Sequence, residues 1–125
     1  MDTLSYLGIK TEYEDQEKVE LSLQLDERHL QPYGVMHGGI SAILIETACS
    51  IGANCALGST THFVVGVDLT VSHLTPATTG KLTVTATPDR VGRSLQVWQA
   101  TVVNEDGKKI AVGRCTLTVA QKTIN

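Results

Sequence analysis

The sequence has no excess of positive charge. Its 10 lysine and arginine residues are outnumbered by 13 aspartate and glutamate residues, which gives a formal net charge of −3 at pH 7. Proteins that bind nucleic acid through its phosphates usually show the opposite balance, so nucleic acid is not an expected partner. Low-complexity tracts and internal repeats are also missing, and 42% hydrophobic with 18% charged residues is typical of a globular protein. We therefore expect residues 1–125 to form one domain.

A secretion signal is missing as well, since no basic segment followed by an apolar one opens the sequence. We therefore expect a cytoplasmic protein. The three cysteines, Cys49, Cys55 and Cys115, agree with this expectation. Their number is odd and they have no CxxC spacing, so we expect reduced, buried thiols. Cys49 stays open as an alternative nucleophile, although nothing in the sequence would activate it.

Metal-binding and several catalytic motifs are not present either. The four histidines form no HxxxH or HxxEH group, and no cysteine pairs with them at ligand spacing, so no metal site is predicted. Neither a Ser-His-Asp nucleophile elbow nor a Walker-type phosphate loop occurs. The one glycine-rich element is HGG at residues 37–39.

What the sequence does contain is a set of strand patterns around one long apolar segment. Residues 18–25 alternate apolar and polar side chains, which predicts a half-buried strand. Further strand-like stretches cover residues 63–73, 81–87, 94–103 and 109–119. Their connections are short, and the last contains the hairpin signal Asp106-Gly107. Short links join antiparallel neighbours, so we predict an α+β fold in which a curled antiparallel sheet of five to six strands wraps around a central helix.

The long apolar segment, residues 40–57, contains a single charged side chain, that of Glu46. We predict a helix that begins at the HGG motif and stops at Gly58. A membrane span of this length is conceivable, but the polar and small residues inside the segment favour close packing within a protein. A carboxylate in a buried helix is costly unless it is used or paired. Glu46 is therefore the leading candidate for a catalytic residue.

The spacing of Glu46 from the helix start carries a prediction about assembly. Free backbone N–H groups at the start of a helix, here at Gly38, suit a developing negative charge. A carboxylate and a backbone donor of this kind suit acyl chemistry, in which both groups act on one carbonyl and each must lie within about 3 Å of it. Eight residues of helix, however, place Gly38 and Glu46 about 12 Å apart. With no proline or later glycine to break the helix before Glu46, we predict a symmetric dimer with antiparallel central helices and two equivalent shared sites.

Three other polar residues are placed near this site by their sequence positions. Ser50 lies four residues after Glu46, on the same helix face, and either hydrogen-bonds the carboxylate or a water or simply packs in the helix contact. Gln31, in the loop before the helix, either orients the reacting groups or is solvated. His37 either donates a hydrogen bond to the substrate or caps the helix.

The segment GVMHGGISAILIETACS resembles the signature of hotdog-fold acyl-CoA thioesterases, in the branch of the phenylacetate-pathway and 4-hydroxybenzoyl-CoA enzymes whose catalytic carboxylate is a helix glutamate. The likeness is strongest to hydrolases of 1,4-dihydroxy-2-naphthoyl-CoA. It includes QPYGVMHGG, VVGVDLTVSH and VGRSLQVWQATVVNEDGK, and covers most of the chain from about Glu20. The resemblance implies a hotdog fold and hydrolysis of an acyl-CoA thioester to free acid and coenzyme A. Coenzyme A is then part of the substrate, and no cofactor is expected.

The resemblance also implies roles for individual residues. Glu46 corresponds to the nucleophile or general base of the family, and Gly38 to its backbone oxyanion donor. Gln31 and His37 correspond to polar residues beside the thioester, and Ser50 to a hydroxyl residue one helical turn after the glutamate.

In this family coenzyme A binds at subunit interfaces, and three segments of this sequence correspond. They are Gly66, then His73, Leu74, Thr75 and Pro76, and finally Arg90, Val91, Gly92, Arg93, Ser94 and Leu95. Arg93 and Ser94 are suitable phosphate partners, although solvated turn residues are the alternative for the arginines. Thr75 departs from the pattern, since relatives often have a basic residue at its position.

The first interpretation of the sequence is therefore a dimeric or tetrameric thioesterase, with the tetramer a dimer of dimers, that acts on aromatic or other bulky acyl-CoA substrates. Two alternatives stay open. A hotdog dehydratase of hydroxyacyl thioesters would use differently spaced motifs, and a non-catalytic acyl-CoA-binding domain would have no need of Glu46, Gly38 and Gln31 together.

Overall fold

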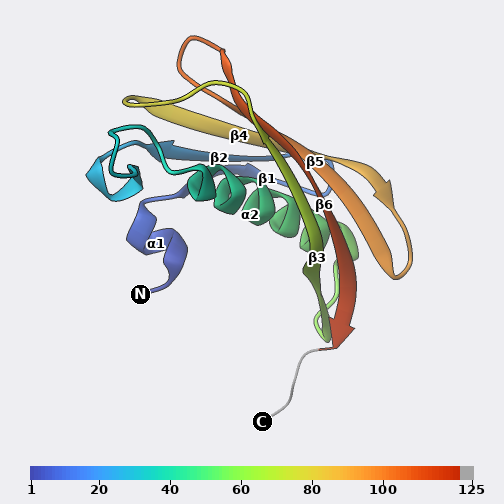
Figure 1. Cartoon of the computed structure of the whole chain (residues 1–125). Helices are drawn as coiled ribbons and strands as arrows, with labels where there is room; N and C mark the ends of the chain where they lie inside the picture. The colour runs from blue at the N-terminus through green and yellow to red at the C-terminus, as the bar shows by residue number, and fades with distance from the viewer. Residues whose placement is uncertain (122–125) are drawn as a thin grey trace.

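The computed structural model describes residues 1–121 and shows one antiparallel sheet curled around one long helix (Figure 1). The elements in chain order are α1 (Thr3–Leu7), β1 (Lys10–Glu14), β2 (Val19–Gln24), the 3-10 helix η1 (Glu27–His29), α2 (Gly38–Leu57), β3 (His62–His73), β4 (Lys81–Val91), β5 (Leu95–Val103) and β6 (Lys109–Gln121). The six strands are ordered β1-β2-β4-β5-β6-β3. The predicted α+β architecture is confirmed.

The central helix α2 begins and ends where the sequence predicts. The side chain of His37 caps it, because its Nδ1 atom accepts a hydrogen bond of 2.8 Å from the Gly39 N–H. At the other end Gly58 adopts a left-handed conformation with φ of 59°, and its N–H donates to the Asn54 carbonyl. Although α2 is long and apolar enough to cross a membrane by composition, it is the core helix of this fold and contacts all six strands.

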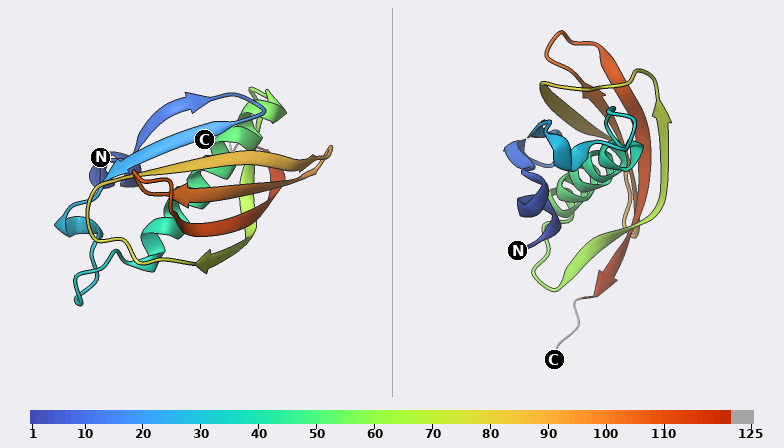
Figure 2. Two further views of the ribbon diagram at one scale, coloured as in Figure 1. Left: turned by 90° about the horizontal axis from the view of Figure 1, so that it is seen from above. Right: turned by 60° about the vertical axis from the view of Figure 1, so that its left-hand side comes forward.

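The sheet covers α2 on one side only. In the right view of Figure 2, α1 lies on one side of the helix and the strands β3 and β6 lie on the other. The helix side chains that face the sheet, such as Leu44, Ile45 and Ala48, are fully buried, whereas Ile43, Thr47 and Ser50 are half-exposed in the single chain. The sheet was expected to wrap the apolar helix, and it does so on one helix face. The opposite face of α2 is not covered by the sheet.

A buried polar pair fixes the helix against the middle of the sheet. The Trp98 ring lies directly over Gly52, where any side chain would overlap it. The Trp98 indole N–H donates to Gln96 Oε1 at 2.8 Å, and Gln96 Nε2 donates to the Ala53 carbonyl at 3.0 Å. Because every polar atom of this buried group has a partner, Trp98 and Gln96 stabilise one position of α2 on β5.

One strand limit differs from its prediction, and one strand was not predicted individually. The connection expected at residues 88–93 is shorter, since β4 continues through Pro88 to Val91 with a bulge between Pro88 and Arg90. Pro88 is tolerated there because β2 pairs with β4 only as far as Ala86, so the side of the strand without an N–H has no partner strand. The strand β1 was not predicted individually, because all five of its residues are exposed and show no alternating apolar pattern.

Candidate active site

Glu46 lies in the middle of α2, half-buried, with its carboxylate against β3. A Cβ atom added to Gly66 of β3 would overlap Glu46 Oε2, so the missing side chain of Gly66 makes the space that this carboxylate occupies. No hydrogen bond or ion pair to the Glu46 carboxylate occurs among residues 1–121. Within the described part of the chain, packing alone therefore positions this carboxylate.

A cavity of about 370 Å³ opens beside Glu46. Its lining residues are Leu4, Ile43, Glu46, Thr47, Ser50, Ile51 and Asn54. Ser50 thus lies on the same side of the helix as Glu46, as the four-residue spacing predicts. The structure brings these two predicted residues together with Gly66, and adds Leu4 from the distant N-terminal helix α1.

The nearby thiols do not compete as nucleophiles. Burial, with smaller contributions from the neighbouring Cys115 and Glu46, raises the pKa of the Cys49 thiol to about 12. Burial also raises the pKa of Cys115 to about 11. A thiol attacks only as its thiolate, and almost none is present at neutral pH when the pKa is this high. The alternative role for Cys49 is therefore wrong on physical grounds.

The start of α2 offers a free donor. The Gly39 N–H is used by His37, while no hydrogen bond to the Gly38 N–H is found in the described part of the chain. The positive end of a 20-residue helix adds a favourable potential at this point. The ring of His73 lies close against Gly38, because a Cβ atom there would be 3.0 Å from His73 Cε1.

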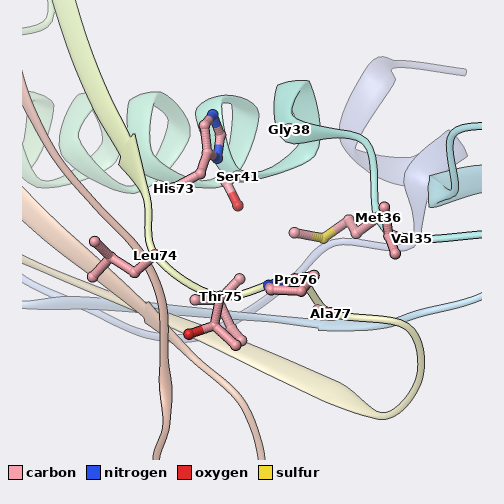
Figure 3. A pocket seen from close by; sticks show the side chains of 10 residues that line it. Val35, Met36, Gly38, Ser41, His73, Leu74, Thr75, Pro76 and Ala77 are labelled. Atoms are coloured by element: carbon pink, nitrogen blue, oxygen red, sulfur yellow. The ribbon is translucent and has the colours of Figure 1, made fainter.

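A second cavity, of about 320 Å³, lies between the start of α2 and the segment that follows β3 (Figure 3). Its lining residues are Val35, Met36, Gly38, Ser41, His73, Leu74, Thr75, Pro76, Ala77 and Ile110. The predicted segment from His73 to Pro76 is therefore next to Gly38. The Ser41 side chain also points to this cavity, and its hydroxyl is fully buried without a hydrogen-bond partner among the described residues.

The polar residues before the helix are engaged locally. His37 is exposed and serves as the helix cap, so one of its two predicted roles is observed. Because Nδ1 accepts a hydrogen bond, the proton of the neutral ring is on Nε2, which points away from the cap as a free donor. Gln31 Oε1 accepts a hydrogen bond from the Tyr33 N–H and closes the turn at residues 31–34. In the single chain Gln31 lines neither cavity.

The third predicted segment, Arg90 to Leu95, is at the opposite end of the sheet. It includes the turn between β4 and β5, whereas His73–Pro76 lies near the beginning of β4, and the eleven residues of β4 span about 33 Å from Lys81 to Val91. Arg90 and Arg93 are exposed, and neither forms an ion pair within residues 1–121. One chain therefore does not bring the three predicted coenzyme A segments together.

Leu4 and Ser41 are among the cavity residues that were not predicted. Leu4 belongs to a helix of five residues, too short to show a periodic pattern, and its place beside Glu46 depends on tertiary packing. Ser41 is a small residue in an apolar helix, a pattern that indicates close packing. No cluster of His, Cys, Asp or Glu able to hold a metal ion occurs among residues 1–121.

Comparisons with known proteins agree with this fold. The chain matches the thioesterase superfamily over residues 33–111. It is 34% identical to a 1,4-dihydroxy-2-naphthoyl-CoA hydrolase from Listeria monocytogenes over 93% of this chain and 94% of the relative. The crystal structure of a thioesterase from Haemophilus influenzae superposes with a TM-score of 0.90 and 38% identity, over 96% of this chain and 83% of that one.

A more distant structure shows the same fold. The PaaI protein of the phenylacetic acid degradation operon of Escherichia coli superposes with a TM-score of 0.86 at 23% identity, over 98% of this chain and 86% of that one. The chain belongs to the thioesterase superfamily, with the hotdog fold, and is a thioester hydrolase.

Proposed function

We propose that the protein hydrolyses acyl-CoA thioesters with an aromatic or other bulky acyl group, releasing the free acid and coenzyme A. The observation that carries the proposal is the pairing of an unpartnered carboxylate, Glu46, with an open backbone donor, the Gly38 N–H, on one helix. The family membership supports the reaction class. The naphthoyl-CoA hydrolases among the relatives support an aromatic substrate.

The site is shared between two subunits. Because α2 is a continuous helix from Gly38 to Leu57, Gly38 and Glu46 of one chain are about 12 Å apart and cannot contact the same carbonyl. Antiparallel packing of two α2 helices through their open faces brings Glu46 of one subunit to the helix start of the other. Two-fold symmetry then creates two equivalent sites, and a tetramer is a pair of such dimers.

In this arrangement the thioester carbonyl oxygen accepts a hydrogen bond from the Gly38 N–H. Glu46 either attacks the carbonyl carbon, which expels the coenzyme A thiolate and leaves an anhydride for water to cleave, or removes a proton from a water that attacks directly. An oxyanion donor typically contributes about 10²–10³ in rate. We assign Ser50 to positioning the water or carboxylate, and Gln31 and the His37 Nε2–H to contacts beside the thioester.

Coenzyme A binds across subunits, since within one chain the segment from Arg90 to Leu95 is at the opposite end of the sheet from the segment His73–Pro76. Gly66 and the segment from His73 to Pro76 lie near the reacting groups. The exposed Arg90 and Arg93, with Ser94, supply charge and hydroxyl donors for phosphates at the end of the sheet. Thr75 has no charge to contribute, so the arginines provide the cationic contacts.

The test is an acyl-CoA panel in which released thiol is followed with a thiol-reactive dye. The panel contains phenylacetyl-, hydroxybenzoyl-, dihydroxynaphthoyl- and medium-chain acyl-CoA, assayed with wild type, Glu46→Ala and the isosteric Glu46→Gln. We expect hydrolysis of an aromatic substrate, reduced about 10³-fold or more in both variants. Absence of hydrolysis across the panel refutes the acyl-CoA proposal, and a wild-type rate in Glu46→Gln refutes the role of Glu46.

A further inference from the structure

We propose that the N-terminal helix α1 forms the acyl-side wall of the active site, and that Leu4 sets the size of the acyl group accepted. This proposal rests on the proposed thioesterase function and names a specificity-determining residue for it. Leu4 is the one residue outside α2 that lines the cavity beside Glu46 in the described part of the chain.

The position of Glu46 determines what this cavity holds. A carboxylate that attacks a thioester carbon, or activates a water to do so, lies within about 3–4 Å of the reacting atoms. The carbonyl carbon has two substituents, the rest of the acyl group and the coenzyme A sulfur, and these must point in different directions. One of them enters the cavity that Leu4, Ile43 and Ile51 enclose around Glu46.

The charge and polarity of the walls favour the acyl group. The cavity is lined by a carboxylate and by no lysine or arginine, so it does not suit the phosphates of coenzyme A. Leu4, Ile43 and Ile51 offer apolar surface. The Asn54 amide is already used, since Nδ2 donates to the Ser50 carbonyl at 2.9 Å and Oδ1 accepts from the Val64 N–H at 3.0 Å. An apolar acyl group therefore matches these walls best.

The helix that carries Leu4 is held firmly despite its five residues. Leu7 is buried in the core, and its carbonyl oxygen accepts a hydrogen bond of 2.7 Å from Nε2 of the fully buried His29. Arg28 donates to the Tyr6 carbonyl and lies over the Tyr6 ring. Segments near a chain end are usually mobile unless they are tied down in this way. The anchoring by η1 gives Leu4 a fixed position. A residue that selects substrates by size must be held in place in this way.

The experiment compares Leu4→Ala and Leu4→Phe with wild type, and uses Thr3→Ala as a control. Thr3 is exposed on the same helix and does not line the cavity. The readout is the ratio of kcat/KM for 2-naphthoyl-CoA to kcat/KM for benzoyl-CoA. We expect Leu4→Ala to raise this ratio about tenfold and Leu4→Phe to lower it about tenfold, while Thr3→Ala leaves it unchanged.

Using a ratio separates this proposal from the function on which it rests. If wild type hydrolyses neither these two thioesters nor any member of the acyl-CoA panel, the proposed function fails. If wild type is active and both Leu4 variants keep the wild-type ratio, the function stands and the wall assignment is wrong. A variant that is poorly folded loses activity on both substrates equally, so only opposite changes in the two variants support the assignment. Shifts of the same direction in both variants also overturn it.

Discussion

At the scale of single residues, the clearest relation in this protein is between Glu46 and Gly66. The sequence indicates that Glu46 is important because a charge in an apolar helix is costly, but it gives no reason for a glycine in a strand. The structure supplies one, because only a residue without Cβ leaves room for the carboxylate on β3. Gly66 therefore determines where the reacting oxygen atoms lie.

This relation predicts that Gly66→Ala separates activity from stability. The new methyl group meets the flexible end of the Glu46 side chain, which moves aside without disturbing the backbone. We expect kcat to fall about 100-fold, as is typical when a catalytic group is displaced by about 1 Å, with a small change in Tm. Steady-state kinetics and thermal unfolding measure the two effects. Equal activity of Gly66→Ala and wild type contradicts the placement of the carboxylate.

At the scale of elements, the N-terminal region is held by one buried histidine. His29 ends η1, and its ring joins two segments, since Nδ1 accepts from the Asp26 N–H at 3.0 Å and Nε2 donates to the Leu7 carbonyl at 2.7 Å. Both ring nitrogen atoms of this fully buried side chain thus have hydrogen-bond partners. The attachment of α1 to the rest of the fold thus depends on a residue that is far from it in sequence.

Replacing His29 is therefore expected to loosen α1 and to lower stability. His29→Ala leaves the Asp26 N–H and the Leu7 carbonyl without their partner, and we expect the free energy of unfolding to fall by about 3 kcal/mol. Urea unfolding measures this change, and amide hydrogen exchange at Gly8 and Ile9 reports the local effect. The control is His62→Ala, because within residues 1–121 the His62 ring is hydrogen-bonded only to the hydroxyl of its neighbour Thr61, so its loss should cost less than about 1 kcal/mol. Similar losses in the two variants would show that the anchor is unimportant.

At the scale of the whole molecule, the site proposed here exists only in an assembly. One chain has its carboxylate, Glu46, and its backbone donor, Gly38, eight residues apart on one helix, and its arginine turn at the far end of the sheet from that helix start. The open face of α2 and the exposed β3 edge, with Val65 and Val67, are surfaces that a second copy would cover. A site in which Gly38 and Glu46 contact the same carbonyl therefore needs a second chain, whatever the substrate.

Complementation between two inactive variants tests this sharing. Gly38→Pro removes the backbone N–H at a position where helices tolerate proline, and we expect it to reduce kcat about 10²–10³-fold. Gly38→Ala is the matched control, since it adds the same Cβ atom against His73 but keeps the N–H. When Gly38→Pro and Glu46→Ala chains are co-expressed, random pairing leaves one intact site in half of the dimers. The mixture should therefore recover about a quarter of wild-type activity, whereas a site within one chain recovers none.

Much of the fold was predictable because it depends on local patterns. The alternation in β2, the hairpin signal at Asp106-Gly107, and the limits of α2 at the HGG motif and Gly58 are set by backbone preferences of nearby residues. The same helix pattern singled out Glu46, and the spacing to Gly38 predicted that one chain cannot complete the site. These conclusions need no knowledge of which strands are neighbours.

The surroundings of Glu46 were decided only by the tertiary structure. Gly66 reaches the carboxylate because the register of β3 against β6 and the curl of the sheet place it there, and Leu4 reaches the same cavity because His29 anchors α1. Contacts between residues so far apart in sequence depend on packing and strand order, and local preferences do not encode these. The sequence by itself therefore determined the helix and its reactive carboxylate, while the tertiary structure decided which side chains surround that carboxylate.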